Sequence, residues 1–203
     1  DFEVSHYAMP ERMRDEVRAT SIEAIKSLDA WHLEKCASVK AEFEDHMKTR
    51  ERPEVRRHRH ELEAALEGCV GVCIAGGHVA VLVNRLSLFG LEDILGDRAV
   101  FAWTAGAMAI TDRIVLFHDD PPQGQVAEQI LDVGLGLVPR TVVFPTPERR
   151  LRLDDAANIA LLSRRFAPAT CLVLPDRSWV TWAAGTYGKT QGIVRMTETG
   201  ATV

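Results

Sequence analysis

Residues 100–107 read Val-Phe-Ala-Trp-Thr-Ala-Gly-Ala. An apolar run stops at a small polar residue, Thr104, and Ala-Gly follows it, which is the pattern of a strand that turns sharply into a helix. Many hydrolases present their nucleophile at the tip of such a turn. The stretch therefore predicts a strand-to-helix turn at Thr104 and makes this threonine the first candidate for a site residue.

The chain before this turn predicts helices only. Apolar residues recur at three- and four-residue steps from residue 10 to about residue 48, and a second helical pattern follows Pro53 and ends near Gly68. Nothing in residues 1–67 has the pattern of a strand. Either the first strands precede Asp1 in a longer polypeptide, or the long helices replace them. The helix from residue 10 to about residue 48 is also too long for one small α/β domain to cover, so we expect the protein to be a homodimer or a part of a larger polypeptide.

From Cys69 onward, short apolar runs alternate with helical stretches. This alternation favours an α/β fold with a mostly parallel sheet flanked by helices, and with ligands at the carboxyl ends of the strands. We expect a helical extension over residues 1–67 and an α/β domain over residues 68–203. The expected strands are 69–75, 98–103, 141–144, 170–174 and 179–183, and the expected helices are 79–89, a helix from 106, and 154–166.

Composition excludes several classes of protein. Of the 203 residues, 46% are hydrophobic and 26% charged, and the net charge of −5 gives no argument for binding nucleic acid or an anionic membrane. No apolar run has the length of a membrane span and no signal segment is recognisable, so we expect a cytoplasmic protein. Cysteines stand at positions 36, 69, 73 and 171, without the paired spacing of a zinc site. We interpret them as buried free thiols and expect neither a metal nor another cofactor.

Three stretches resemble a known family. Ala75-Gly76-Gly77-His78, then Trp103-Thr104-Ala105-Gly106-Ala107-Met108, then Gly134-Leu135-Gly136-Leu137-Val138-Pro139 resemble three ordered motifs of the peptidase E and cyanophycinase family. These are serine peptidases with the class I glutamine amidotransferase-like fold. The resemblance covers the chain from about Glu61 to the C-terminus.

The resemblance implies roles for particular residues. Thr104 stands where the family has its serine nucleophile, and Thr146 stands where it has its histidine base. Asp119 lies near the acidic position of the triad, although it fits a loop before two prolines equally well. The backbone N–H groups of an oxyanion hole would come from Gly76, Gly77 and Ala105.

The two threonines change the expected chemistry. A hydroxyl is a poor nucleophile unless a positioned base takes its proton, and losing one member of a triad lowers the rate by orders of magnitude. Threonine nucleophiles typically use the amine of a free N-terminus, and Thr104 is internal. The turn itself often requires positive φ, where a β-branched residue is an outlier.

Other side chains offer partial substitutes. His78 and His118 lie near the expected crevice and are possible bases, although we favour a loop or helix-start role for both. Arg149, Arg150 and Arg152 resemble an arginine-bearing stretch of cyanophycinase-like proteins and could hold a carboxylate. The alternative is a salt-bridged helix entry with the neighbouring acidic residues.

We therefore expect a catalytically impaired domain of this family with a binding, scaffolding or regulatory role, and a peptide or a small molecule as its ligand. The alternative is a hydrolase of peptide or amide bonds that uses Thr104 as its nucleophile and His78 or His118 as its base. An amidotransferase is a weaker third reading, because that chemistry requires a cysteine at the turn.

Overall fold

The computed structural model describes residues 10–116 and 128–203. Its helices are α1 (Glu11–Met47), η2 (Thr49–Glu51), α2 (Pro53–Leu66), α3 (Val79–Leu88), α4 (Leu91–Ile94), α5 (Ala105–Ala109), η3 (Pro147–Arg149) and α6 (Ala156–Phe166). Its strands are β1 (Gly71–Ile74), β2 (Ala99–Ala102), β3 (Ile114–Leu116), β4 (Gln129–Asp132), β5 (Thr141–Pro145), β6 (Thr170–Leu174), β7 (Trp179–Ala183), β8 (Thr186–Gln191) and β9 (Val194–Arg195).

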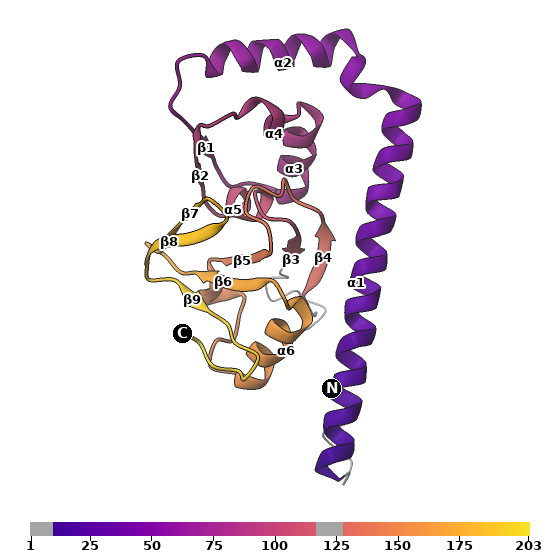
Figure 1. Ribbon diagram of the computed structural model, residues 1–203, viewed down its shortest axis with the longest axis vertical. Coiled ribbons are helices and arrows are strands. Elements are labelled where there is room, and N and C mark those ends of the chain that lie inside the picture. Colours follow the sequence, from indigo (N-terminus) through magenta and orange to yellow (C-terminus); the bar gives the residue numbers. More distant parts are fainter. Residues whose placement is uncertain (1–9, 117–127) are drawn as a thin grey trace.

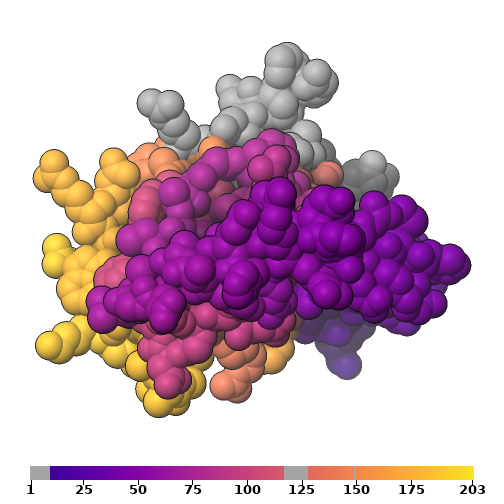
Figure 2. Space-filling model, turned by 90° about the horizontal axis from the view of Figure 1, so that it is seen from above, coloured from indigo at the N-terminus to yellow at the C-terminus, as the bar shows by residue number. Residues whose placement is uncertain are grey.

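The N-terminal part is helical, as its pattern predicted, and residues 10–67 contain no strand. The long helix α1 runs along one side of the molecule and contacts α6 and β4, while α2 crosses one end (Figure 1). Viewed from that end, the C-terminal part of α1 and α2 form much of the surface (Figure 2). Among the described residues, no helix combines the length and apolarity needed to cross a bilayer.

Two polar contacts fix α1 on the domain. The guanidinium of Arg165 donates to both carboxylate oxygens of Asp29, each at 2.7 Å, and both side chains are only 13% exposed. Further along the helix, Lys40 pairs with Asp132 on β4. Because Leu33 also packs on the main core, α1 is held by one face.

The strands of the described residues form four small sheets rather than the one largely parallel sheet expected. The pairs β1–β2 and β5–β6 are parallel, whereas β3–β4, β6–β9 and β7–β8 are antiparallel. The expectation of parallel strands was correct for these two pairs, but it did not predict the three antiparallel pairs. The β7–β8 hairpin was not predicted because its turn sequence, Ala-Gly, is not a typical hairpin signal. Ala184 and Gly185 nevertheless both have positive φ, as a tight two-residue hairpin requires.

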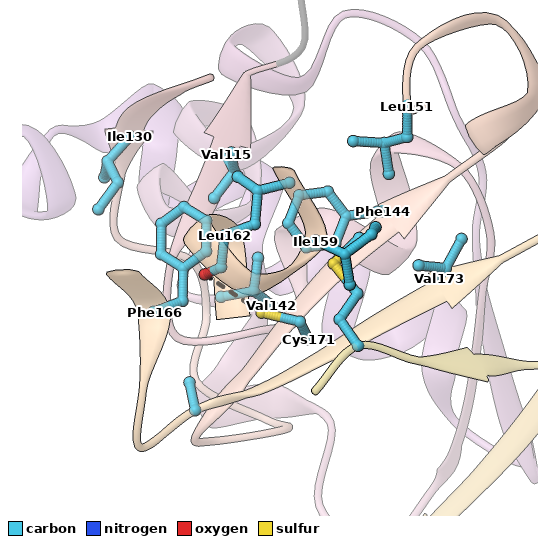
Figure 3. Packing of buried hydrophobic residues seen from close by; sticks show 12 residues of the cluster. Val115, Ile130, Val142, Phe144, Leu151, Ile159, Leu162, Phe166, Cys171 and Val173 are labelled. Atoms are coloured by element: carbon cyan, nitrogen blue, oxygen red, sulfur yellow. Dashed lines mark hydrogen bonds between the residues drawn. The ribbon is translucent and has the colours of Figure 1, made fainter. Parts of the chain in front are cut away.

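The largest core lies between the β5–β6 pair and α6 (Figure 3). Phe144 and Phe166 are fully buried there, with ring centroids 6.2 Å apart. Cys171 lies in the same cluster, and burial raises the pKa of its thiol to about 12.

The expectation of buried thiols is wrong for three of the four cysteines. Cys36 is half-buried, and Cys69 and Cys73 are exposed, although all four are free. Cys69 lies before β1 rather than inside it, because the strand begins only at Gly71. The apolar spacing did not reveal that Cys73 lies on an uncovered face of its strand.

Candidate strand-to-helix turn at Thr104

Thr104 lies at the turn between β2 and α5, where the apolar run followed by Ala-Gly predicted it. It is the N-cap of α5, with φ 49° and ψ −123°. Two backbone hydrogen bonds fold the chain back here, from Gly106 N to Trp103 O (2.9 Å) and from Trp103 N to Ile74 O (3.3 Å). Positive φ is an outlier for a β-branched residue and costs on the order of 1–3 kcal/mol. The turn therefore keeps its shape around a residue that disfavours it.

Two glycines allow this turn to pack on the end of β1. A Cβ on Gly76 would collide with Thr104 Oγ1, and a Cβ on Gly106 would collide with the carbonyl of Ile74. Only hydrogen fits at either position without displacement of a neighbour. The first two motifs of the resemblance therefore meet at one point.

The third motif supports the other end of α5. Leu135 N donates to Ala109 O at 2.8 Å and Val138 N donates to Ile110 O at 2.9 Å. A Cβ on Gly134 would collide with the backbone oxygen of Thr111, so this close approach also requires glycine. All three motifs thus surround the short helix α5, although they are far apart in the sequence.

The first two motifs contain three backbone amides without a hydrogen-bond acceptor in the described part of the chain. Over the described residues, no oxygen accepts a hydrogen bond from the N–H of Gly76, Gly77 or Ala105. The position of Ala105 N is 3.8 Å from where a Cβ on Gly76 would lie, so these two residues approach each other closely. Gly77 has φ 131°, which favours glycine strongly. Backbone N–H groups without an internal acceptor are suited to donate to a carbonyl or carboxylate oxygen.

The Thr104 side chain is exposed and has no proton acceptor within the part of the chain that the structure describes. Its hydroxyl makes no hydrogen bond there. His78 is the N-cap of α3 and is exposed, and its side chain makes no capping hydrogen bond. His118 and Asp119 lie outside the described residues. Neither imidazole is therefore placed against the hydroxyl by the described geometry.

Thr146 directly follows β5 and also has positive φ (φ 52°, ψ 61°). Its N–H donates to Leu174 O at 3.1 Å, and Pro147 starts η3 directly after it. Although the residue before a proline is biased toward extended backbone, Thr146 is not extended, because the chain must leave β5 and enter the 3₁₀ turn within one residue. Thr104 and Thr146, two of the positions at which the chain departs from the family motif, therefore both carry a β-branched residue in an unfavourable conformation.

The arginine segment enters α6 as an ion-paired turn. Arg152 lies 3.3 Å from Asp155, whose other carboxylate oxygen accepts from Ala157 N and Asn158 N and caps the helix. Arg150 is exposed, and the side chain of Arg149 lies outside the described part. For Arg152, the salt-bridged helix entry is the alternative that the structure shows.

The sequence did not predict two surface pockets. One of about 420 Å³ lies between α2 and the α3–α4 region and is lined mainly by Leu62, Leu86, Phe89 and Leu91. The other, of about 290 Å³, is lined by residues that include Arg140, Trp182 and Tyr187. Neither is lined by the Thr104 turn. No group of three potential metal ligands occurs among residues 10–116 and 128–203.

Comparison with protein-family models gave no match, and comparison with curated proteins gave none either.

Proposed function

We propose that the chain is a catalytically impaired domain of the peptidase E and cyanophycinase type, which binds a peptide or small molecule through an amide or carboxylate group and does not cleave it. The observation that carries the proposal is the Thr104 hydroxyl. It sits exposed at a nucleophile-like turn, with no base against it among the described residues.

The chemistry of the turn supports binding over cleavage. A hydroxyl keeps its proton at neutral pH unless a base removes it, so attack on an amide would be slow. The amides of Gly76, Gly77 and Ala105 need no such activation to donate hydrogen bonds to a bound oxygen. The site would therefore bind and orient a ligand but would not attack it.

The backbone conformation at Thr146 supports the proposal that the domain derives from a catalytically active one. Histidine is among the residues that tolerate positive φ best, whereas threonine does so poorly. The positive φ at position 146 therefore suits the histidine of the family motif better than the threonine that is present. The same mismatch holds at Thr104, where the turn resembles a nucleophile elbow.

A hydrolase with Thr104 as its nucleophile is the second candidate. The exposed hydroxyl and the neighbouring motif amides without an acceptor favour it, since both would serve an acyl-transfer step. It requires a base, which His118 or His78 would have to supply.

One titration experiment distinguishes binding from cleavage. An aspartyl dipeptide and a β-aspartyl-arginine peptide, the substrate types that the resemblance implies, are titrated into the protein and then recovered. We expect saturable binding, intact peptide, and weaker binding to Gly76→Ala, whose methyl group displaces Thr104. Gly68→Ala is the control: Gly68 has φ 76°, so the methyl group strains the local backbone, but it meets nothing within 4 Å. Failure of both peptides to bind would contradict the ligand class, and cleavage would favour the second candidate.

A further inference from the structure

The pocket of about 420 Å³ lies between α2 and the turn that joins α3 to α4, and we call it the α2 pocket. Its apolar walls are Leu62 of α2, Leu86 of α3, Phe89 after α3 and Leu91 at the start of α4. Leu62 packs against none of the three apolar clusters of the described residues. Small-molecule sites have volumes of about 300–1,000 Å³ and mainly apolar walls. The α2 pocket therefore has the size and the lining of a ligand site.

Polar contacts on both sides of Leu62 hold α2 at this distance from α3 and α4 (Figure 1). Before it on the helix, Arg59 Nη1 lies 3.3 Å from Asp93 Oδ2. At the end of the helix, Arg98 Nη2 donates to Leu66 O at 3.0 Å. Because these contacts span the helix, Leu62 cannot close onto the opposite wall without breaking them. An apolar ligand that displaced water from the pocket would therefore bury surface that the protein itself leaves uncovered.

The pocket lining has one uncommitted charge. The guanidinium of Arg85 makes no hydrogen bond or ion pair with the residues that the structure describes. Arg85 is adjacent to Leu86 and lies one helical turn before Phe89, so its charge stands at the edge of the apolar walls. The Glu61 carboxylate, by contrast, already pairs with Arg57, 3.6 Å away on the same helix.

The one imidazole in the described lining is also engaged. His58 Nδ1 lies 2.9 Å from Glu61 Oε2, and His58 Nε2 lies 3.5 Å from Arg57 Nη2. In the tautomer that suits both contacts, Nδ1–H donates to the carboxylate and Nε2 accepts from the guanidinium. The ring packs edge-on against Phe89, with centroids 6.1 Å apart. His58 is therefore part of the wall, and Arg85 is the group left to recognise a ligand's charge.

We propose that the α2 pocket binds a small amphipathic carboxylate, whose apolar body lies between Leu62 and Phe89 and whose carboxylate pairs with Arg85. A guanidinium binds a carboxylate bidentately, which fixes orientation as well as charge. A cationic head group would meet the like charge of Arg85, and an uncharged one would forgo the ion pair.

This site is separate from the Thr104 turn. The Gly76-Gly77 motif precedes α3, whereas Arg85 and Phe89 lie at the other end of that ten-residue helix, about 15 Å away at 1.5 Å per residue. The two sites can therefore be occupied independently.

Three probes that share one apolar body test the charge preference. Phenylbutyrate, phenylbutanol and phenylbutylamine are titrated separately into the isotope-labelled full chain, and amide and methyl NMR shifts are followed. We expect saturable binding of phenylbutyrate with shift changes at Leu62, Leu86 and Leu91. The alcohol should bind about fivefold more weakly, the upper range for an exposed ion pair, and the amine more weakly still. Phenylbutyrate that does not saturate, or that binds no better than the amine, would overturn the proposal.

One substitution tests the role of the guanidinium. Arg85→Gln should make the acid bind no better than the alcohol, because only the ion pair distinguishes them. Arg56→Gln is the matched control, since it removes the same charge at an exposed position of α2 that does not line the pocket. A preference for the acid that survives Arg85→Gln would overturn the assignment of Arg85.

A second substitution locates the apolar body. Leu62→Trp should abolish binding, because the indole fills the pocket, while an unchanged melting temperature would show that the chain stays folded. Ala64→Trp is the control, at an exposed position of α2 outside the lining. Gly76→Ala, at the Thr104 turn, should also leave binding unchanged, so the result does not depend on the proposed function. Binding that Leu62→Trp leaves intact would place the probe elsewhere and overturn the proposal.

Discussion

Thr104 Oγ1 occupies the space that a side chain on Gly76 would need. Twenty-eight positions separate these residues in the sequence, yet the end of β1 and the start of α5 approach so closely that only hydrogen fits between them. The first two motifs form one structural unit through this contact.

A double-mutant cycle measures the contact. Gly76→Ala should lower the free energy of unfolding by about 1–3 kcal/mol, because the new methyl group overlaps Thr104. Thr104→Gly should restore much of that loss, since it removes the atoms in the way. Gly106→Ala is the control, because its clash is with the Ile74 backbone and Thr104→Gly should not relieve it. Additive effects of Gly76→Ala and Thr104→Gly in urea unfolding would show that the two residues do not touch.

Thr104→Gly alone should stabilise the protein. The substitution removes a β-branched side chain from a backbone with φ 49°, and the relief of roughly 1–3 kcal/mol exceeds the added entropy of glycine in the unfolded chain, about 0.4–1 kcal/mol. Thr190→Gly, at an exposed position in β8, lacks positive φ and should destabilise. Thermal unfolding of both variants checks the sign, and a lower melting temperature for Thr104→Gly would mean that the turn is not strained.

The sequence predicted the turn, the two N-terminal helices and the main parallel strands, because each rests on local spacing or on a local turn signal. It did not predict that the strands divide into small sheets, since pairing depends on contacts between distant segments. It also misjudged Cys73, because an apolar alternation does not reveal whether a partner covers the strand. The exposure of one sheet face is a property of the tertiary arrangement.

The candidate site was predictable to a similar extent. The glycines of the motifs and Thr104 do meet, because close packing at such a turn demands glycine at fixed places. The conformation of Thr146 was not predictable, because the restriction that Pro147 imposes competes with the geometry at the end of β5. Ion pairing of Arg152 was one of two stated alternatives, and only the structure distinguishes them.

The pair between Asp29 and Arg165 should hold α1 on the domain. Asp29→Asn leaves the guanidinium without a charged partner at a site where both side chains are 13% exposed. We expect a loss of about 2–3 kcal/mol and faster amide exchange in α1. Glu16→Gln breaks an ion pair with Arg12 whose side chains are 68% and 92% exposed, and should cost less than about 0.5 kcal/mol. Equal effects of the two variants would argue against a fixed α1.

Burial should protect Cys171 from alkylation. Loss of water around the thiol raises its pKa from 9.0 to about 12, and the thiolate is the reactive form. At pH 8 to 9, mass spectrometry should find Cys73 modified and Cys171 unmodified until the protein is denatured.

The same pKa shift has a consequence for stability. A raised folded pKa leaves stability unaffected below pH 9 and lowers it as the pH rises from 9 toward 12, because the unfolded thiol ionises first. Cys171→Ala should flatten this part of the pH dependence. An unchanged slope in that variant would show that another group is responsible.

The most direct test of the account is turnover at Thr104. The native chain, Thr104→Ala, Thr104→Ser, Thr146→His and the Thr104→Ser/Thr146→His double variant are compared on aspartyl dipeptides and a β-aspartyl-arginine peptide. We predict that the native chain is no faster than Thr104→Ala, and that Thr104→Ser alone gains no activity, because a hydroxyl without a base keeps its proton. Hydrolysis by the native chain that Thr104→Ala abolishes would contradict the central claim and establish Thr104 as a working nucleophile.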